Sequence, residues 1–277
     1  RDMHPAILVP ILTHLAESVD RSAAAKWADW LVGMEEDPYM DTFPEAFRAR
    51  WLMCLCSLDL LDQARALYRR WTGASGSPLE PKVRTAYQSR HTSLNFSGNA
   101  VYRQIHHAFG SQAPHESAEV VHPATDNIIH RNGACMLALV RKFGHGTQWK
   151  NAPDTQFARA VRDDFLVHVY GSHMPPSHYE LTALLQACML LREHQVAMRV
   201  LRTMESFGYE LDAKDMAVLL GGMMDVNPSA AVMIMKHLSA PLSQNPHLYA
   251  AVLSRCVSSS HFELADQVYD MACQHYL

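Results

Sequence analysis

Histidine and cysteine are the residues of this chain that could bind a metal ion, but their spacing does not form a metal site. The sequence has 17 histidines and six cysteines. Cys54 and Cys56 are two apart in a helical pattern, so their side chains point to nearly opposite faces and do not easily chelate one ion. His168, His173 and His178 are close in sequence but match no metal-ligand motif. We expect no metal or other cofactor, and we expect the cysteines to be buried, reduced thiols.

Adjacent carboxylates at Asp163 and Asp164 are the nearest approach in the sequence to a paired general acid and base. Neighbouring residues on a helix point about 100° apart, so these side chains would face different surroundings. The chain contains no nucleophile elbow, no phosphate-binding glycine loop and no dinucleotide-binding glycine motif. We therefore predict that the protein is not an enzyme. An enzyme with a degenerate helical domain remains open only because residues 74–122 follow no readable pattern.

The elements that would position any site repeat along the chain. Residues 179–212 and 248–273 each contain an apolar helix, a short polar break and a second helix that begins around an alanine. An alanine at the equivalent place of the pattern occurs five times along the chain: Ala24, Ala64, Ala197, Ala231 and Ala265. The last three are 34 residues apart, and the first two are 40 apart. Such self-similarity is typical of a solenoid, in which each hairpin buries its apolar face by stacking on neighbours.

Apolar residues four and seven positions after these alanines predict the buried face of each second helix. The predicted stripes are Ala64–Tyr68–Trp71, Ala197–Leu201–Met204 and Ala265–Tyr269–Ala272. Polar breaks then separate the helices. Ser177 is a predicted N-cap, Gly208 suits a left-handed C-cap, and the segments 227–229 and 258–260 are predicted hairpin turns.

These signals divide the chain into three parts. Residues 1–73 are predicted to form helical hairpins, residues 74–122 an irregular insertion or a diverged repeat, and residues 123–277 the C-terminal repeats. In the last part, residues 132–143 and 155–170 fit one hairpin with an enlarged loop. Strand-like alternation is scarce. The predicted fold class is all-α, an α-solenoid of stacked helical hairpins.

The segment 178–212 resembles a unit of the pentatricopeptide-repeat (PPR) family, whose units are paired helices of about 35 residues. The residues that carry the resemblance are Leu184, Leu185, Ala197, Leu201, Met204, Gly208 and Asp212. Segments 213–245 and 246–277 look like further units. Segments 5–38 and 45–73 are weaker matches that could also pass for tetratricopeptide-like hairpins. The tetratricopeptide pattern of Trp, Leu-Gly and Tyr is absent, which favours the PPR family.

The resemblance implies binding of single-stranded RNA, mostly in mitochondria or chloroplasts, with one base read by each unit. Carried over residue by residue, the reading pair of the best unit would be Thr182 and Asp212. The first-helix positions that correspond to Thr182 elsewhere have side chains that do not hydrogen-bond a base: Val9, Ala49, Ala217 and Ala250. One readable unit does not make a sequence-specific RNA-binding protein.

The charge balance also favours protein partners. The chain has 24 Lys and Arg against 28 Asp and Glu, a net charge of −4, whereas RNA phosphates require a basic groove. Three basic residues are candidates to support RNA binding. Lys214 lies on a predicted first helix of the C-terminal repeats, and Arg48 and Arg50 lie on one in the N-terminal part.

We expect a non-catalytic, PPR-like subunit of a mitochondrial ribonucleoprotein assembly, such as the mitochondrial ribosome or machinery that processes, stabilises or translates RNA. Its partners would be protein subunits of that assembly and single-stranded or ribosomal RNA. The alternative is a protein-interaction scaffold or assembly factor without direct RNA contact, which grips a partner helix or an extended peptide. No apolar run reaches 18 residues, so no membrane span is predicted.

Overall fold

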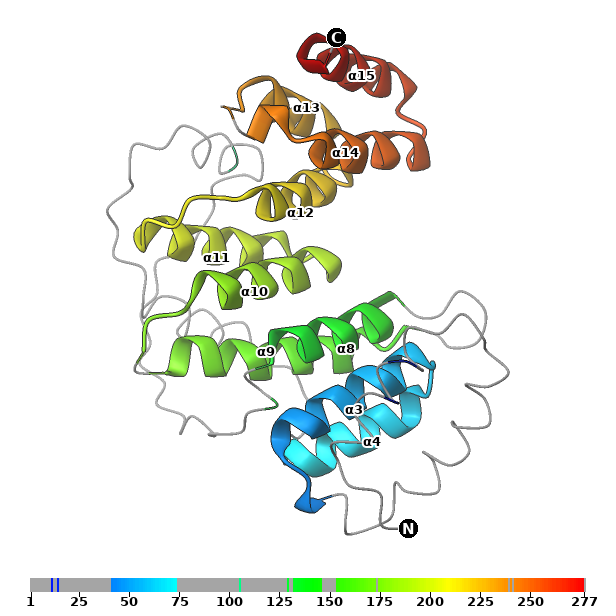
Figure 1. Ribbon diagram of the computed structural model, residues 1–277, viewed down its shortest axis with the longest axis vertical. Helices are drawn as coiled ribbons and strands as arrows, with labels where there is room; N and C mark the ends of the chain where they lie inside the picture. Colours follow the sequence, from blue (N-terminus) through cyan, green and yellow to red (C-terminus); the bar gives the residue numbers. More distant parts are fainter. Residues whose placement is uncertain are drawn as a thin grey trace. The chain divides into compact units, whose positions relative to one another are not determined.

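Helices make up all the regular structure of the described residues, which confirms the predicted all-α class (Figure 1). The computed structural model describes residues 41–73, 132–145, 153–172, 174–238 and 242–276, with single positions at 11, 14, 105, 129 and 240. Ten α-helices form within these ranges, with 3-10 structure at residues 41–42 and 242–244, and no strand does. The predicted hairpin of residues 5–38 and the irregular part at 74–122 lie outside them, apart from the single positions.

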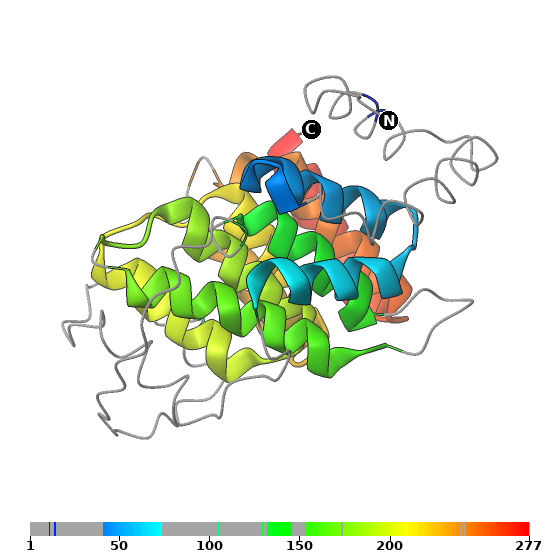
Figure 2. The same ribbon diagram turned by 90° about the horizontal axis from the view of Figure 1, so that it is seen from below.

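The described helices fall into two compact units. The first unit contains α3 (Glu45–Ser57), α4 (Leu61–Thr72), α8 (Gly133–His145) and α9 (Thr155–Gly171). Helix α3 lies beside α4, α8 pairs with α9, and α3 also packs on α8 (Figure 1 and Figure 2). Both helices predicted around the enlarged loop are present, and they pack on each other as expected.

Aromatic side chains fill the core of the first unit. Phe157 meets Tyr68 with ring centroids 5.7 Å apart and Phe143 at 4.6 Å, both edge to face. Such pairs add about 0.5–1.5 kcal/mol beyond the burial of their surface. Ala64, Tyr68 and Trp71 are all buried, so the stripe predicted for α4 is confirmed.

The adjacent carboxylates of α9 face different partners, as the helical angle between them predicted. Asp163 Oδ1 accepts from Arg162 Nε at 2.7 Å, and both side chains are fully buried. Asp164 instead accepts from the hydroxyl of Tyr68 on α4 at 2.8 Å. Burial raises the pKa of Asp164 to about 6, and Asp163 adds to this shift while the Tyr68 hydrogen bond opposes it. Asp164 therefore links two helices and does not share a site with Asp163.

We expect Asp164 to make the first unit less stable as the pH rises from about 4 to 6. An unfolded aspartate titrates near pH 4, whereas folded Asp164 has a pKa of about 6. The raised pKa means that its protonated form favours folding, so the stabilisation present below pH 4 is lost as pH passes 6. The loss should be on the order of 2 kcal/mol. In urea unfolding, the chain should lose this amount relative to its Asp164→Asn variant, and a pH-independent difference between the two would contradict the assignment.

The second unit consists of three successive helical hairpins. They are α10 (His178–Leu190) with α11 (His194–Ser206), α12 (Ala213–Met224) with α13 (Pro228–Lys236), and α14 (Pro246–Ser258) with α15 (Phe262–Tyr276). A short 3-10 helix, η2 (Leu242–Gln244), precedes α14. The first helices form a row, in which α12 packs on α10 and α14 packs on α12 (Figure 1). Helix α15 packs likewise on α13.

The helix boundaries in this unit follow the predicted breaks. Ser177 caps α10 in a reciprocal capping box with Glu180. Gly208 follows α11 in the left-handed conformation, with φ of 70°. Asn227 caps α13 directly before Pro228.

The recurring alanine occupies the fourth position of the second helix in every described hairpin that contains it. Ala64, Ala197 and Ala231 are at most 1% exposed, whereas Ala265 is only half-buried. A methyl group at this position lets the two helices approach closely. The recurring alanine is therefore a buried position in three of the four described second helices that contain it.

The stripe predicted for α15 is wrong at its central residue. Tyr269 is 61% exposed, and its neighbour Val268 is the fully buried residue. In α11, by contrast, Leu201 and Met204 are completely buried as predicted. Helix α15 packs mainly on α13 and α14, and the side that carries Tyr269 is left open to solvent.

Three of the hairpins share one turn. Asp59, Arg192 and Ser260 each stand two residues before a second helix and have φ between 57° and 59°. In each turn the next N–H donates to the carbonyl five residues earlier: Leu60 to Leu55, Glu193 to Cys188, and His261 to Cys256, at 2.8–2.9 Å. This is the bond of a Schellman motif. The same turn therefore occurs in both units.

We expect Arg192→Gly to raise the free energy of unfolding by about 0.5–1 kcal/mol. Glycine removes a left-handed cost of about 1–2 kcal/mol and loses part of that gain to its greater freedom in the unfolded chain. The control is Ala250→Gly at an exposed position inside α14, which should cost about 1 kcal/mol. Urea unfolding measures both. A loss of stability in Arg192→Gly would show that the turn does not strain the arginine.

Candidate functional site

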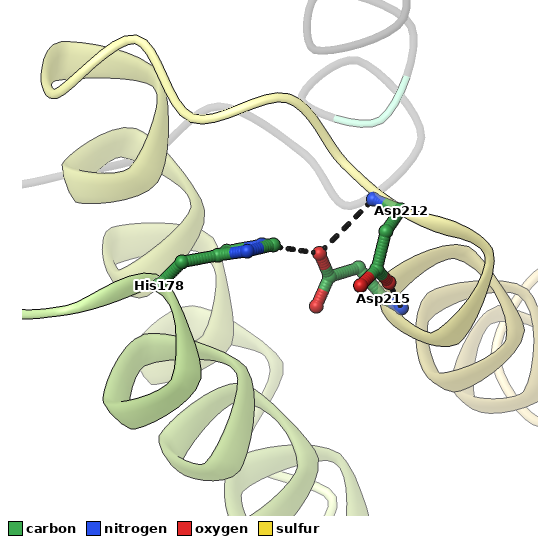
Figure 3. A group of neighbouring side chains, drawn as sticks. All are labelled: His178, Asp212 and Asp215. Carbon is green, nitrogen blue, oxygen red and sulfur yellow. Dashed lines mark hydrogen bonds and ion pairs between the residues drawn. The ribbon is translucent and has the colours of Figure 1, made fainter.

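Four polar side chains meet where α10 and α12 begin. His178 is the first residue of α10, and Thr182 lies one turn further along. Asp212 caps α12, and Asp215 lies in its first turn. Figure 3 shows His178 reaching from its helix toward the two aspartates. We call these four residues the Asp215 cluster.

The two aspartates are held by the local structure of α12. The N–H of Asp215 donates to Asp212 Oδ1 at 2.8 Å, and the N–H of Asp212 donates to Asp215 Oδ2 at 3.2 Å. This reciprocal pair is a capping box built from two aspartates. It satisfies N–H groups at the helix start and places both carboxylates at the positive end of the helix dipole.

Asp215 also joins α12 to α10. Its side chain is completely buried, and Oδ1 accepts from the hydroxyl of Thr182 at 2.7 Å. Oδ2 lies 2.8 Å from Nε2 of His178, whose side chain is 34% exposed. One buried carboxylate thus receives bonds from two side chains and a main-chain N–H, which is the satisfaction a buried charge requires.

Aromatic rings continue from the cluster toward the surface. Tyr209 stacks on His178 with ring centroids 5.4 Å apart and an interplanar angle of 29°. Phe207 follows at 6.0 Å from Tyr209 and is 36% exposed. Tyr179, next to His178 on α10, is 56% exposed. The surroundings of the cluster therefore offer flat faces as well as charges.

The structure places three of the predicted RNA-binding residues together. Thr182 and Asp212 each bond to Asp215, and Lys214 directly precedes Asp215 in the sequence of α12. Their accessibility differs, because Thr182 is 5% exposed and has its hydroxyl directed to Asp215. Asp212 and Lys214 are exposed.

The other two predicted residues belong to the first unit and lie on α3. Arg48 Nε donates to the carbonyl of Phe43 at 3.0 Å, and its guanidinium lies 6.0 Å from the ring centre of Trp71. Arg48 is therefore engaged in packing within its own unit. Arg50 is exposed.

His178, Asp212 and Asp215 could also bind a divalent metal ion. They each offer a ligand atom, and these atoms all lie within 4.8 Å of one another. Imidazole and carboxylate are ligands that zinc accepts. A bound ion would have to replace the contacts of Asp215 Oδ2 with His178 and with the N–H of Asp212. The capping box of α12 and the bonds of Asp215 to His178 and Thr182 account for the arrangement without a metal.

Apart from the Asp215 cluster, a pocket lies between α13 and α15. It has a volume of about 430 Å³, and among its lining residues are Met235, Lys236, Gln267, Asp270 and Met271. Lys236 Nζ donates to Gln267 Oε1 at 3.4 Å.

The cysteines are thiols without disulfide bonds, as predicted, and five of the six are buried. Burial raises the pKa of Cys54 to about 11 and that of Cys56 to about 12. Burial likewise raises the pKa of Cys135. These side chains stay protonated at neutral pH and are poor nucleophiles.

His178 and Asp215 were not predicted as site residues, although the sequence contains signals for both. Asp212 and Asp215 have the spacing of a capping box, and His178 and Thr182 have the i, i+4 spacing of one helix face. What the sequence lacks is a signal that these two pairs face each other, because that depends on how α12 packs on α10.

No family model, curated protein or solved structure matches this chain. Among the helices of the described residues, none combines the length and the apolar composition needed to cross a bilayer.

Proposed function

We propose that this chain is a non-catalytic helical-repeat subunit of a mitochondrial ribonucleoprotein assembly, held there mainly by contacts with protein. The observation that carries the proposal is the repetition of hairpins in α10–α15, with the same alanine position and a recurring turn. Stacked hairpins of an α-solenoid present an extended surface to a partner. The mitochondrial location and the ribonucleoprotein rest on the resemblance of residues 178–212 to a PPR unit.

The distribution of charge supports protein as the main partner. The first helices α10, α12 and α14 contain one lysine, Lys214, and one arginine, Arg255. Arg255 lies 3.5 Å from Asp225, so part of its charge is compensated within the chain. A groove that binds RNA neutralises several phosphates. Two basic residues on three helices offer little for that purpose.

The chemistry of the polar side chains supports a binding role. In the Asp215 cluster Asp212 and Asp215 cap α12, and Asp215 also accepts a hydrogen bond from Thr182 of the neighbouring α10. Asp164 accepts from Tyr68, which ties α9 to α4. Asp215 and Asp164 therefore each connect two helices, and such contacts stabilise the packing of a scaffold.

Direct contact with RNA at the Asp215 cluster is the second candidate, and one observation favours it. Tyr179, Asp212 and Lys214 are all exposed, and they belong to the cap and first turns of neighbouring first helices. An aromatic face can stack a base, a carboxylate can accept from a base edge, and a lysine can neutralise a phosphate. This would be contact with about one nucleotide.

Titration of a labelled random single-stranded RNA with the full chain decides between the two candidates. With protein as the main partner, we expect no saturable binding at salt concentrations from about 50 to 200 mM. Saturable, salt-sensitive binding that Lys214→Ala weakens would favour the RNA candidate. Lys236→Ala is the control, because Lys236 is also exposed but lies on the second helix α13. A change of base preference in Asp212→Ala would assign the reading residue.

A further inference from the structure

The α14–α15 hairpin exposes one large apolar side chain at a position that the two preceding hairpins bury. Counted from the alanine at the fourth position of the second helix, Tyr269 corresponds to Leu201 in α11 and to Met235 in α13. Leu201 is 0% exposed and Met235 is 3% exposed, whereas Tyr269 is 61% exposed. A repeated core position has therefore become a surface position.

Phe262, Ala265, Tyr269 and Ala272 form one face of α15, since they are spaced by three or four residues. We call these four residues the α15 stripe. Phe262 is 62% exposed, and the two alanines are half-buried. Two aromatic side chains so exposed at the same face of a helix are typical anchors of an interface.

The preceding hairpin indicates what covers such a face. Met235 lies on α13, and α13 packs on α15 of the next hairpin. Within the part of the chain that the structure describes, α15 itself packs mainly on α13 and α14. Among the described helices, no further second helix packs on α15 in the way that α15 packs on α13. The missing neighbour is therefore a helix with an apolar face.

The acidic residues next to the α15 stripe indicate the charge of the helix that covers it. Glu263, Asp266 and Asp270 are all exposed on α15, and the helix contains neither lysine nor arginine. A second copy of α15 would bring these carboxylates against their own kind, which is unfavourable. A helix whose apolar face is flanked by lysine or arginine complements both the stripe and its acidic border.

We propose that the α15 stripe docks an amphipathic, basic helix of a partner protein. The apolar residues of the partner helix recur at i, i+4 and i+7 and pack around Phe262 and Tyr269. The basic residues of the partner helix face three carboxylates, those of Glu263, Asp266 and Asp270. The proposal rests on the protein-binding function above and deepens it by assigning a surface and a class of partner.

A pair of defined peptides tests the docking surface on the full chain. One peptide has about three heptads with leucine at the a and d positions and lysine at e and g; its twin has glutamate at e and g. By fluorescence anisotropy the lysine peptide should bind saturably and about 30-fold more tightly than the glutamate peptide. Tyr269→Asp should weaken its binding about 30-fold, as loss of an aromatic anchor does. Val226→Asp is the control, because Val226 is 51% exposed at another turn of the same unit.

Charge reversal gives a second, independent readout. A variant with Glu263→Lys, Asp266→Lys and Asp270→Lys should prefer the glutamate peptide, and because all three residues are exposed it should remain folded. Binding that survives Tyr269→Asp, or an unchanged peptide preference in the reversed variant, would overturn this surface while leaving a protein-binding function in place. Failure of both peptides to bind would overturn the class of partner. If the chain associates with itself and Tyr269→Asp abolishes that association, the proposed class of partner would be wrong. The stripe would then bind a second copy of this chain.

Discussion

Replacing Asp215 by alanine should lower the free energy of unfolding by about 3 kcal/mol. The carboxylate is fully buried and accepts from Thr182, from His178 and from the N–H of Asp212. Alanine would leave these donors without their acceptor and would break half of the capping box of α12. Urea unfolding monitored by circular dichroism measures the loss.

Asp212→Ala is the matched control, because it removes the other carboxylate of the same box from an exposed position. Loss of a helix cap alone costs about 1 kcal/mol. Thr182→Val keeps the shape of the side chain and removes the hydroxyl, and a double-mutant cycle with Asp215→Ala should show a coupling of about 1 kcal/mol. Equal effects of Asp215→Ala and Asp212→Ala, without coupling to Thr182, would mean that Asp215 acts only as a cap and does not join α10 to α12.

Leucine in place of the recurring alanine should destabilise the buried hairpins and leave the last one nearly unchanged. Ala197 and Ala231 are at most 1% exposed, so the extra carbons of leucine would force their helices apart. We expect Ala197→Leu and Ala231→Leu each to cost about 2–3 kcal/mol. Ala265 is half-buried beside the exposed Tyr269, and Ala265→Leu should change stability by less than about 0.5 kcal/mol.

Urea unfolding measures the stability of the three variants. It shows whether the recurring alanine makes the same helix contact in each hairpin or only recurs in the sequence. A cost at Ala265 as large as that at Ala197 would mean that the α15 stripe is covered within this chain, and it would remove the basis for a partner helix. Negligible costs at Ala197 and Ala231 would mean that the alanine is not where the helices of a hairpin meet.

Much of the fold could be predicted because its determinants are local. The apolar spacing after Ala64 and Ala197 locates the buried face of each second helix, and Ser177, Gly208 and Asn227 mark boundaries through their own side chains or dihedral angles. The exposure of Tyr269 could not be predicted in this way. A periodic pattern identifies the face of a helix that can be buried, but it does not say whether another helix lies against that face.

A hairpin turn was predicted at residues 258–260, where α14 ends, but the left-handed conformation that three hairpin turns share was not predicted. Asp59, Arg192 and Ser260 adopt positive φ although none is glycine, so no residue type marks the left-handed position. The turn is set by hydrogen bonds to carbonyls at the end of the preceding helix. Those carbonyls belong to any sequence, and only the backbone path makes them available.

The candidate site was predicted in its parts and not as a whole. Thr182, Asp212 and Lys214 were expected to act together, and they lie on neighbouring helices. The residue that bonds to both Thr182 and Asp212 is Asp215, which resembles an ordinary first-turn aspartate in the sequence. Its importance comes from burial between α10 and α12, which is a tertiary property. Arg48 shows the reverse case, since a residue expected at an RNA surface packs near Trp71.

The proposed function makes this protein a structural part of a larger particle. Sedimentation of the chain in a lysate of isolated mitochondria measures this most directly, with ultraviolet cross-linking of the gradient fractions to detect RNA in contact with it. We expect the chain to sediment with a large ribonucleoprotein particle, and to remain with the particle's proteins while forming few cross-links to RNA. Sedimentation at the size of the free chain in low salt, or absence of the chain from mitochondria, would contradict the proposed function.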